Sequence, residues 1–353
     1  MQKVTIQPGQ AGQRFDKFLG RHLCGTGMSF IYKMLRKKNI TLNGRKSDGK
    51  ELLKAGDEVS FFFSDETYEK FTHVDSISQS NQGLKINAYT EAYNMLKGIE
   101  ILYEDQDVLF LNKPSGILSQ KASDADISAN EWMIGYLLKK GEISSESLAG
   151  FKPSVCNRLD RNTSGILLCG KSLVGSRELN RLIKEREVRK FYQLFVKGNL
   201  EKEETLEGFL TKDERRNKVT LSTKKTEGST YIKTSYKPLA HNVLQENPSG
   251  KSQNSLKGRK ITFLEVELFT GKTHQIRAHL SSIGYPLVGD YKYGDAAFNA
   301  YFKNKYGVKS QLLHAVRMEF PEKCEALPKL SGMALKSPLP GVFEKIIKDE
   351  NIK

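Results

Sequence analysis

The chain of 353 residues lacks the marks of several protein classes. Its four cysteines are scattered and form no CxxC pair, so we expect a reducing compartment with neither a disulfide framework nor a zinc site. No apolar run is long enough to span a bilayer. The initial stretch MQKVTIQPGQ lacks the apolar segment of a secretory signal. We therefore expect a cytoplasmic protein that does not span a membrane.

Positive charge, in contrast, is abundant. The chain has 56 Lys and Arg against 41 Asp and Glu, a net charge of +15. Such an excess indicates a polyanionic partner, either nucleic acid or an anionic membrane surface. The membrane alternative ranks last, because the chain has no amphipathic helix with exposed large apolar residues. A nucleic-acid-binding protein is favoured.

Residues 1–65 are predicted to form a compact α+β unit. The segment GQRFDKFLGRHL has apolar residues at helical spacing, and Ser29 is a plausible N-cap for a second helix. Lys33, Arg36 and Lys37 are three and four apart, so they share one face of that helix. This basic stripe could follow a phosphate backbone, although an ordinary solvated face is the usual explanation of an isolated stripe.

The remaining chain divides into two parts by composition. Residues 66–97 are polar, with SISQSNQG at the centre, and are predicted to be a linker with a short helix near YTEAYNMLKG. Residues 98–353 are rich in strands, for example ITFLEVELFTG, in which apolar and polar residues alternate. The pattern favours an α+β fold around a mixed, mostly antiparallel sheet.

The stretch NRLDRNTSG contains a carboxylate, Asp160, between two arginines, Arg158 and Arg161. A turn and the apolar run ILL follow, so Asp160 should stand at the mouth of a buried strand. The neighbouring positive charge favours an ionised carboxylate. Two interpretations remain open: a surface ion pair that closes a loop, or an activated carboxylate that faces an anionic substrate.

A second informative stretch is GKTHQIRAHLSSIGYPLVGDYKYG, in which Thr273 is a plausible N-cap for a helix. His274 and His279 are five apart rather than four, which argues against a zinc site. Arg277 is either a structural ion-pair residue or the buried partner that orients a catalytic carboxylate, a task suited to a planar guanidinium group.

Two family resemblances follow from these motifs. Residues 12–63, with two helices, a basic end, an Asn-Gly turn and a GDEV strand, resemble the S4 RNA-binding domain. Residues 98–325 resemble the pseudouridine synthases of the large-subunit ribosomal RNA type, within them the RluC and RluD type. They do so through five ordered motifs: ILYEDQDVLFLNKPSG, NRLDRNTSGILL, KFYQLFVKG, the Arg277 stretch and LLHA.

The second resemblance implies the pseudouridine synthase fold and an isomerisation in which a uridine of 23S ribosomal RNA is detached from its ribose and reattached through carbon five. Asp160 would be the essential carboxylate, as nucleophile or base, Arg277 its ion-pair partner, and Tyr192 the residue that stacks on the target base. No cofactor or metal would be needed, and the protein would be a monomer. The implied substrate-binding residues are Arg158, Arg161, Lys113, His274, Gln275 and Leu313. The S4 resemblance implies RNA contacts from Lys33, Arg36, Lys37, Lys38, Arg45 and Lys46.

The chain departs from the family pattern at two positions, since Asn157 stands where His is usual and Asn162 where Asp is common. We expect altered hydrogen bonding in the loop rather than loss of activity. Two other functions remain open: modification of transfer RNA, and a catalytically silent S4-domain factor in ribosome assembly. Retention of Asp160, Tyr192 and Arg277 argues against the silent factor, because a pure RNA-binding protein would not need all three.

Overall fold

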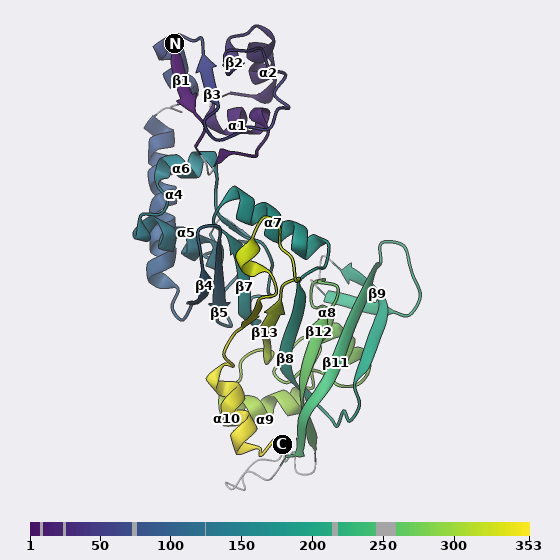
Figure 1. The fold of residues 1–353 in the computed structure, drawn as a ribbon. Helices are drawn as coiled ribbons and strands as arrows, with labels where there is room; N and C mark the ends of the chain where they lie inside the picture. Colours follow the sequence, from purple (N-terminus) through teal and green to yellow (C-terminus); the bar gives the residue numbers. More distant parts are fainter. Residues whose placement is uncertain (8–9, 24–25, 73–75, 124, 214–217, 245–258) are drawn as a thin grey trace.

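A computed structural model describes residues 1–353 except 8–9, 24–25, 73–75, 124, 214–217 and 245–258. The chain begins with a small unit, the N-terminal unit, that lies apart from the large sheet in Figure 1. Its three strands form an antiparallel sheet in the order β1-β3-β2. The elements are β1 (Gln2–Thr5), α1 (Phe15–His22), α2 (Met28–Arg36), β2 (Ile40–Leu42) and β3 (Glu58–Phe61).

The helices of the N-terminal unit form where the apolar spacing predicts them. Phe15, Phe18 and Leu19 of α1 are buried in one core with Phe61 of β3. Ser29 was the wrong N-cap, because α2 begins at Met28 and is preceded by Gly27, which has no side chain to cap it. All six residues predicted to contact RNA, Lys33, Arg36, Lys37, Lys38, Arg45 and Lys46, are exposed.

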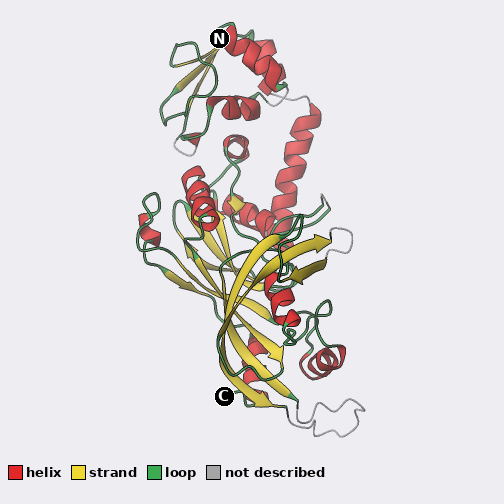
Figure 2. Cartoon of the chain, turned by 90° about the vertical axis from the view of Figure 1, so that its right-hand side faces the viewer, coloured by secondary structure: helices red, strands yellow, loops and turns green. Residues whose placement is uncertain are grey.

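The segment predicted as a polar linker is largely helical. It contains α3 (Asp65–Thr72) and the long helix α4 (Ser76–Met95), which stands between the N-terminal unit and the large sheet in Figure 2. Near its end α4 packs against α5, and the rings of Tyr93 and Trp132 lie 5.5 Å apart. The predicted short helix near YTEAYNMLKG is therefore confirmed, as the end of a longer helix that tertiary packing stabilises and whose polar first part was predicted as linker.

The large sheet has eleven strands among the described residues and is mixed but mostly antiparallel, as predicted. Its main path runs β10-β9-β11-β12-β8-β13-β7-β5-β4, and β13 and β7 are paired in parallel. The strands are β4 (Glu100–Glu104), β5 (Val108–Lys113), β6 (Ser154–Val155), β7 (Ser164–Gly170), β8 (Arg189–Lys197), β9 (Glu204–Asp213), β10 (Lys218–Ser222), β11 (Thr230–Val243), β12 (Lys260–Leu268), β13 (Leu313–Glu319) and β14 (Ala334–Lys336).

Helices cover both faces of this sheet. Leu167 of β7 packs in a core cluster with α5 and α8, whereas Ile166 packs with α7 on the opposite face. A third cluster joins β8 to α9 and α10. The helices are α5 (Ala129–Lys140), α6 (Ser145–Gly150), α7 (Leu173–Lys184), α8 (Gln275–Ser282), α9 (Ala296–Tyr306), the 3-10 helix η2 (Pro328–Leu330) and α10 (Gly341–Asp349).

A polar contact joins the N-terminal unit to the rest of the chain. Arg21 of α1 donates through Nη1 to the carbonyl of Gly150, at the end of α6, over 2.9 Å. The same nitrogen donates to Gln13 Oε1. Among the helices in the described part of the chain, none combines the length and the apolar character needed to cross a membrane.

Candidate active site

Asp160 lies in the loop immediately before β7, a strand whose residues are all buried. The loop closes tightly, since the N–H of Thr163 donates to the Asp160 carbonyl over 3.0 Å. Gly165 has a φ of 109°, and a Cβ there would lie 2.2 Å from the carbonyl oxygen of Ala315 on β13. Only glycine fits this approach. The sequence prediction that Asp160 stands at the mouth of a buried strand is confirmed.

The arginine that faces Asp160 comes from α8. Arg277 Nη1 donates to Asp160 Oδ2 over 3.1 Å. Arg158 and Arg161 are exposed, and Arg161 instead forms an ion pair with Asp126 at 3.5 Å. The positive charge next to Asp160 therefore comes from a residue 117 positions away, and not from the arginines that flank it in the sequence.

Arg277 is held in one orientation by a second carboxylate, Asp290. Its Nε and Nη2 donate to Asp290 over 2.7 and 2.9 Å, a bidentate pair that leaves Nη1 for Asp160. The Asp290 side chain is 0% exposed and also accepts from the backbone N–H groups of Lys292 and Tyr293. Burial pushes the pKa of Asp290 upward, but Arg277 and these N–H groups hold it below its ordinary value.

The reactive potential of Asp160 follows from what its two oxygens contact. Oδ2 is occupied by Arg277, whereas Oδ1 has no hydrogen-bond partner within the described residues. The side chain is 27% exposed, so a substrate can reach it. One oxygen anchored and the other free is an arrangement suited to a carboxylate that acts as nucleophile or base.

His274 lies beside this pair, at the residue before α8 rather than inside the helix. It adopts a left-handed conformation with a φ of 54°, so the prediction that Thr273 caps the helix was wrong. Its Nδ1 contacts the hydroxyl of Tyr293 at 3.0 Å, and its Nε2 lies 3.9 Å from Asp160 Oδ2. Burial lowers the pKa of His274, so the imidazole is neutral near pH 7.

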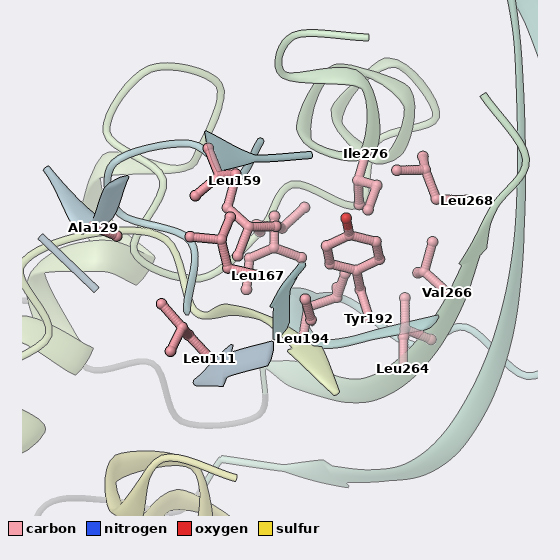
Figure 3. Packing of buried hydrophobic residues seen from close by; sticks show 14 of the residues in the cluster. Leu111, Ala129, Leu159, Leu167, Tyr192, Leu194, Leu264, Val266, Leu268 and Ile276 are labelled. Atoms are coloured by element: carbon pink, nitrogen blue, oxygen red, sulfur yellow. The ribbon is translucent and has the colours of Figure 1, made fainter. Parts of the chain in front are cut away.

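Tyr192 of β8 closes the inner side of the site. It is 6% exposed and packs in the main core cluster, where Figure 3 shows its ring close to Ile276 and Leu194. Burial, and then the charge of Asp160, raise the pKa of the Tyr192 phenol, which therefore keeps its proton at neutral pH. Its stacking role remains a prediction, because the exposed part of the ring is small.

Lys113 ties two loops together beneath the site. The side chain is fully buried, and Nζ donates to the carbonyls of Pro114, Ile117 and Arg161 over 3.0, 2.8 and 3.1 Å. Burial lowers the pKa of Lys113 to about 7, against the opposite effect of Asp160. Its geometry favours positioning of the Asp160 loop over the direct substrate contact predicted from the sequence.

Two further predicted substrate contacts also lie inside the protein. Gln275 is buried, and its side-chain amide donates to the Lys233 carbonyl and to Thr234, and accepts from Thr270. It therefore links α8 to β11. Leu313 is buried at the start of β13 in the main core cluster. Both support the site from within the core.

The two departures from the family pattern have different surroundings. Asn157 accepts from the Leu168 N–H over 2.7 Å and donates to the Ile166 carbonyl over 3.3 Å, so its amide extends the edge of β7. The backbone carbonyl of Asn162 accepts from Ser115 over 2.9 Å. Asn157 thus fastens the loop by hydrogen bonds, and that the two departures leave activity intact stays a prediction.

Sequence reasoning missed Asp290 and Tyr293. Both stand in GDYKYG, at the end of the motif that contains Arg277, but nothing in the spacing shows which of the chain's 41 acidic residues meets that arginine. Tyr293 places its ring 5.2 Å from the Arg277 guanidinium carbon. A buried arginine requires a buried carboxylate, and this requirement was the available signal.

The buried ammonium of Lys113 leads to a prediction about stability. Its pKa is about 7 in the folded protein and near 10.4 in an unfolded chain. Between these values the unfolded state binds one more proton, so the Lys113 contribution to the free energy of unfolding rises with pH, by up to about 1.4 kcal/mol per unit. Urea denaturation tests the prediction. The free energy of unfolding of the wild type minus that of Lys113→Met should increase as the pH rises from 6.5 to 9.5.

A matched control is Lys323→Met, which removes an exposed lysine whose side chain is 79% exposed. Its difference from the wild type should stay flat over the same pH range. A flat difference for Lys113→Met as well would show that Lys113 keeps an ordinary pKa in the folded protein.

Comparisons with known proteins agree with this geometry. A family model described as RNA pseudouridylate synthase matches residues 107–282. The ribosomal large subunit pseudouridine synthase C of Haemophilus ducreyi is 30% identical over 340 residues, which cover 93% of this chain and 90% of that protein. The protein of the same name from Vibrio parahaemolyticus is 29% identical over 357 residues, covering 98% and 96%.

A solved structure shows the same fold. Human RNA Pseudouridylate Synthase Domain Containing 4 superposes with a TM-score of 0.54 at 19% identity, over 76% of this chain and 98% of that one. The sequence matches extend over nearly the whole chain, including the residues around Asp160 and Arg277. The chain therefore belongs to the RNA pseudouridylate synthase family and is an isomerase.

Proposed function

We propose that this enzyme converts specific uridines of 23S ribosomal RNA to pseudouridine, with Asp160 as the catalytic carboxylate. The catalytic role is supported by the hydrogen bonds that link Asp290 to Arg277 and Arg277 to Asp160. They hold Oδ2 of Asp160 in place and leave its Oδ1 free. The ribosomal substrate is supported by the names of the relatives, which are large subunit synthases matching almost the full chain. We place the reaction in the cytoplasm and in a monomer.

The chemistry needs little beyond these groups. The target base must leave its stack before its glycosidic bond is accessible, at a cost of a few kcal/mol. Asp160 then acts on the nucleoside as nucleophile or base, and Arg277 holds the carboxylate in place throughout. Tyr192 and His274 lie near the carboxylate in their neutral forms, in which the phenol can donate a proton and the imidazole can accept one. An isomerisation has no net redox change, so these side chains suffice.

The N-terminal unit is proposed to be an S4-like RNA-binding domain. Its six exposed Lys and Arg residues, from Lys33 to Lys46, form no ion pair among the described residues. Free cations on one small unit are suited to contact with a phosphate backbone. We further propose that residues 1–65 are this domain, that residues 98–353 are the catalytic domain, and that the linker between them, residues 66–97, contains the helix α4.

Mapping pseudouridine in ribosomal and transfer RNA from cells that lack this protein tests the proposal. Sites lost in the deletion and restored by the wild-type gene would identify the substrate. Loss confined to transfer RNA would overturn the ribosomal assignment and leave the enzyme class intact. If no site is lost, purified protein on unmodified ribosomal RNA separates redundancy from a wrong substrate.

The basic stripe leads to a prediction about RNA affinity. Removing its charges in Lys33→Ala/Arg36→Ala/Lys37→Ala should weaken binding at low salt while kcat at saturating RNA stays unchanged. The slope of log affinity against log salt should become shallower by about two to three units. Each phosphate contact that is lost leaves about one counterion fewer to be released on binding. Filter binding over a range of salt concentrations measures both effects.

The matched control removes three exposed lysines from the C-terminal part: Lys323→Ala/Lys329→Ala/Lys348→Ala. Its net charge is the same as that of the stripe variant. Equal salt slopes for the two variants would mean that overall charge, and not the N-terminal unit, governs RNA binding.

A further inference from the structure

A cavity of about 710 Å³ lies next to the Asp160 loop. It is bordered by the turn after β5, the start of β7, the segment between α9 and β13, and the segment before α10. Asp160, Tyr192 and Arg277 are not among its lining residues, so it is separate from the catalytic groups. Its size is in the range of pockets that hold small organic ligands.

Gln311 is the notable side chain of this cavity. It is only 6% exposed, yet its side-chain amide has no hydrogen-bond partner within the described part of the chain. Its amide nitrogen and oxygen are not among the fully buried side-chain atoms without a partner, so they are open to the cavity and free to bind a ligand. An unpaired amide that borders a cavity therefore indicates a ligand with both a donor and an acceptor to offer.

The other walls are suited to a flat heterocycle with a phosphate attached. Val308, Leu339 and Val342 contribute apolar surface. Lys309 is exposed at the cavity and forms no ion pair among the described residues. A nucleotide combines these requirements, since the base has apolar faces and a polar edge and the phosphate is anionic.

The cavity is continuous with the catalytic loop. Asn162 and Ser164, which line it, are two and four residues after Asp160. Ser115 donates to the Asn162 carbonyl over 2.9 Å and contacts Ser310 Oγ at 3.2 Å. One hydrogen-bonded unit thus joins the loop to the segment that contains Gln311. The cavity and the Asp160 loop therefore share residues and hydrogen bonds.

We propose that this cavity binds a base of the RNA substrate that flanks the target uridine, and that Gln311 recognises its edge through paired hydrogen bonds. The inference rests on the proposed function, because it places the base on the same RNA chain. A glutamine amide matches the adjacent donor and acceptor of adenine best. The cavity thereby contributes to the choice of the modified site.

The test uses transcripts of the 23S segment around the uridine found by mapping, with each flanking nucleotide made abasic in turn. For the wild type, one abasic position should raise KM by about tenfold, the size of one paired amide–base contact. For Gln311→Met, which keeps the side-chain volume, the intact transcript should show a higher KM than with the wild type. The abasic change should raise the KM of this variant by less than it does for the wild type, because only the apolar contacts of the base remain to be lost. The kcat of both enzymes should be equal.

Two controls make the result decisive. Asn304→Ala, on the exposed side of α9, should respond to abasic positions as the wild type does. The midpoint temperature of thermal unfolding should be the same for Gln311→Met as for the wild type, because the Gln311 amide lines the cavity and makes no hydrogen bond to the described part of the chain. If the wild type is active and both enzymes respond identically at every position, the base pocket is overturned and the proposed function stands. If the wild type modifies no ribosomal transcript, both proposals fall.

Discussion

Asp160→Asn is expected to reduce pseudouridine formation by about 10⁴-fold, the upper end of the effect of a lost catalytic acid or base. The amide keeps the shape of the carboxylate, and its oxygen can still accept from Arg277. It lacks the nucleophilic and basic oxygen, so the chemical step fails while the surrounding structure is retained. Release of tritium from carbon five of labelled uridine in RNA measures the loss.

Affinity for RNA should not fall in the same variant, because one negative charge is removed from a basic protein. Asp349→Asn, an exposed carboxylate of α10, provides the matched control and should keep full activity. Activity of Asp160→Asn within a few-fold of the wild type would contradict the catalytic assignment.

The second large effect is expected at the buried pair of Arg277 and Asp290. Arg277→Met leaves the fully buried Asp290 carboxylate without its partner, which should lower the free energy of unfolding by about 3–5 kcal/mol. The double variant Arg277→Met/Asp290→Leu removes both charges and should regain most of that stability. Urea denaturation of the two variants measures these changes.

Activity separates the structural role of the pair from its role in orienting Asp160. The double variant should remain inactive although it is stable, because nothing then holds Asp160 Oδ2. Recovery of activity together with stability would show that Arg277 serves folding alone. Asp295→Asn, which breaks the partly exposed pair with Lys197, should cost far less stability.

The same pair determines stability at acidic pH. Since the pKa of Asp290 is lower in the folded protein than in the unfolded chain, its contribution is complete above the unfolded value near 3.9. The contribution is lost as the pH falls through the folded pKa. The free energy of unfolding of the wild type, relative to that of the double variant, should therefore stay constant at neutral pH and fall in acid, which urea denaturation of both proteins measures.

Local periodicity was sufficient to predict much of the fold. In β12 the apolar residues Leu264, Val266 and Leu268 pack in the core, whereas Glu265 and Glu267 pair with arginines on the other face. Strands and short amphipathic helices were predictable, because each has one buried face that is visible at a spacing of two or of three to four residues. Of the helix α4, only the end was predicted, because the polar first part of the helix has no apolar face that shows in the sequence.

The sequence by itself determined that Asp160 stands at the mouth of a buried strand, because a turn and an apolar run follow it directly. Its catalytic role came from the family resemblance and stays a prediction. Only the tertiary structure decided its partners. Arg277 is 117 residues away, Asp290 completes the ion pair, and Lys113 holds the loop by main-chain carbonyls that any sequence would have. Such contacts depend on where distant segments meet, and their geometry follows from packing of the whole sheet rather than from any local pattern.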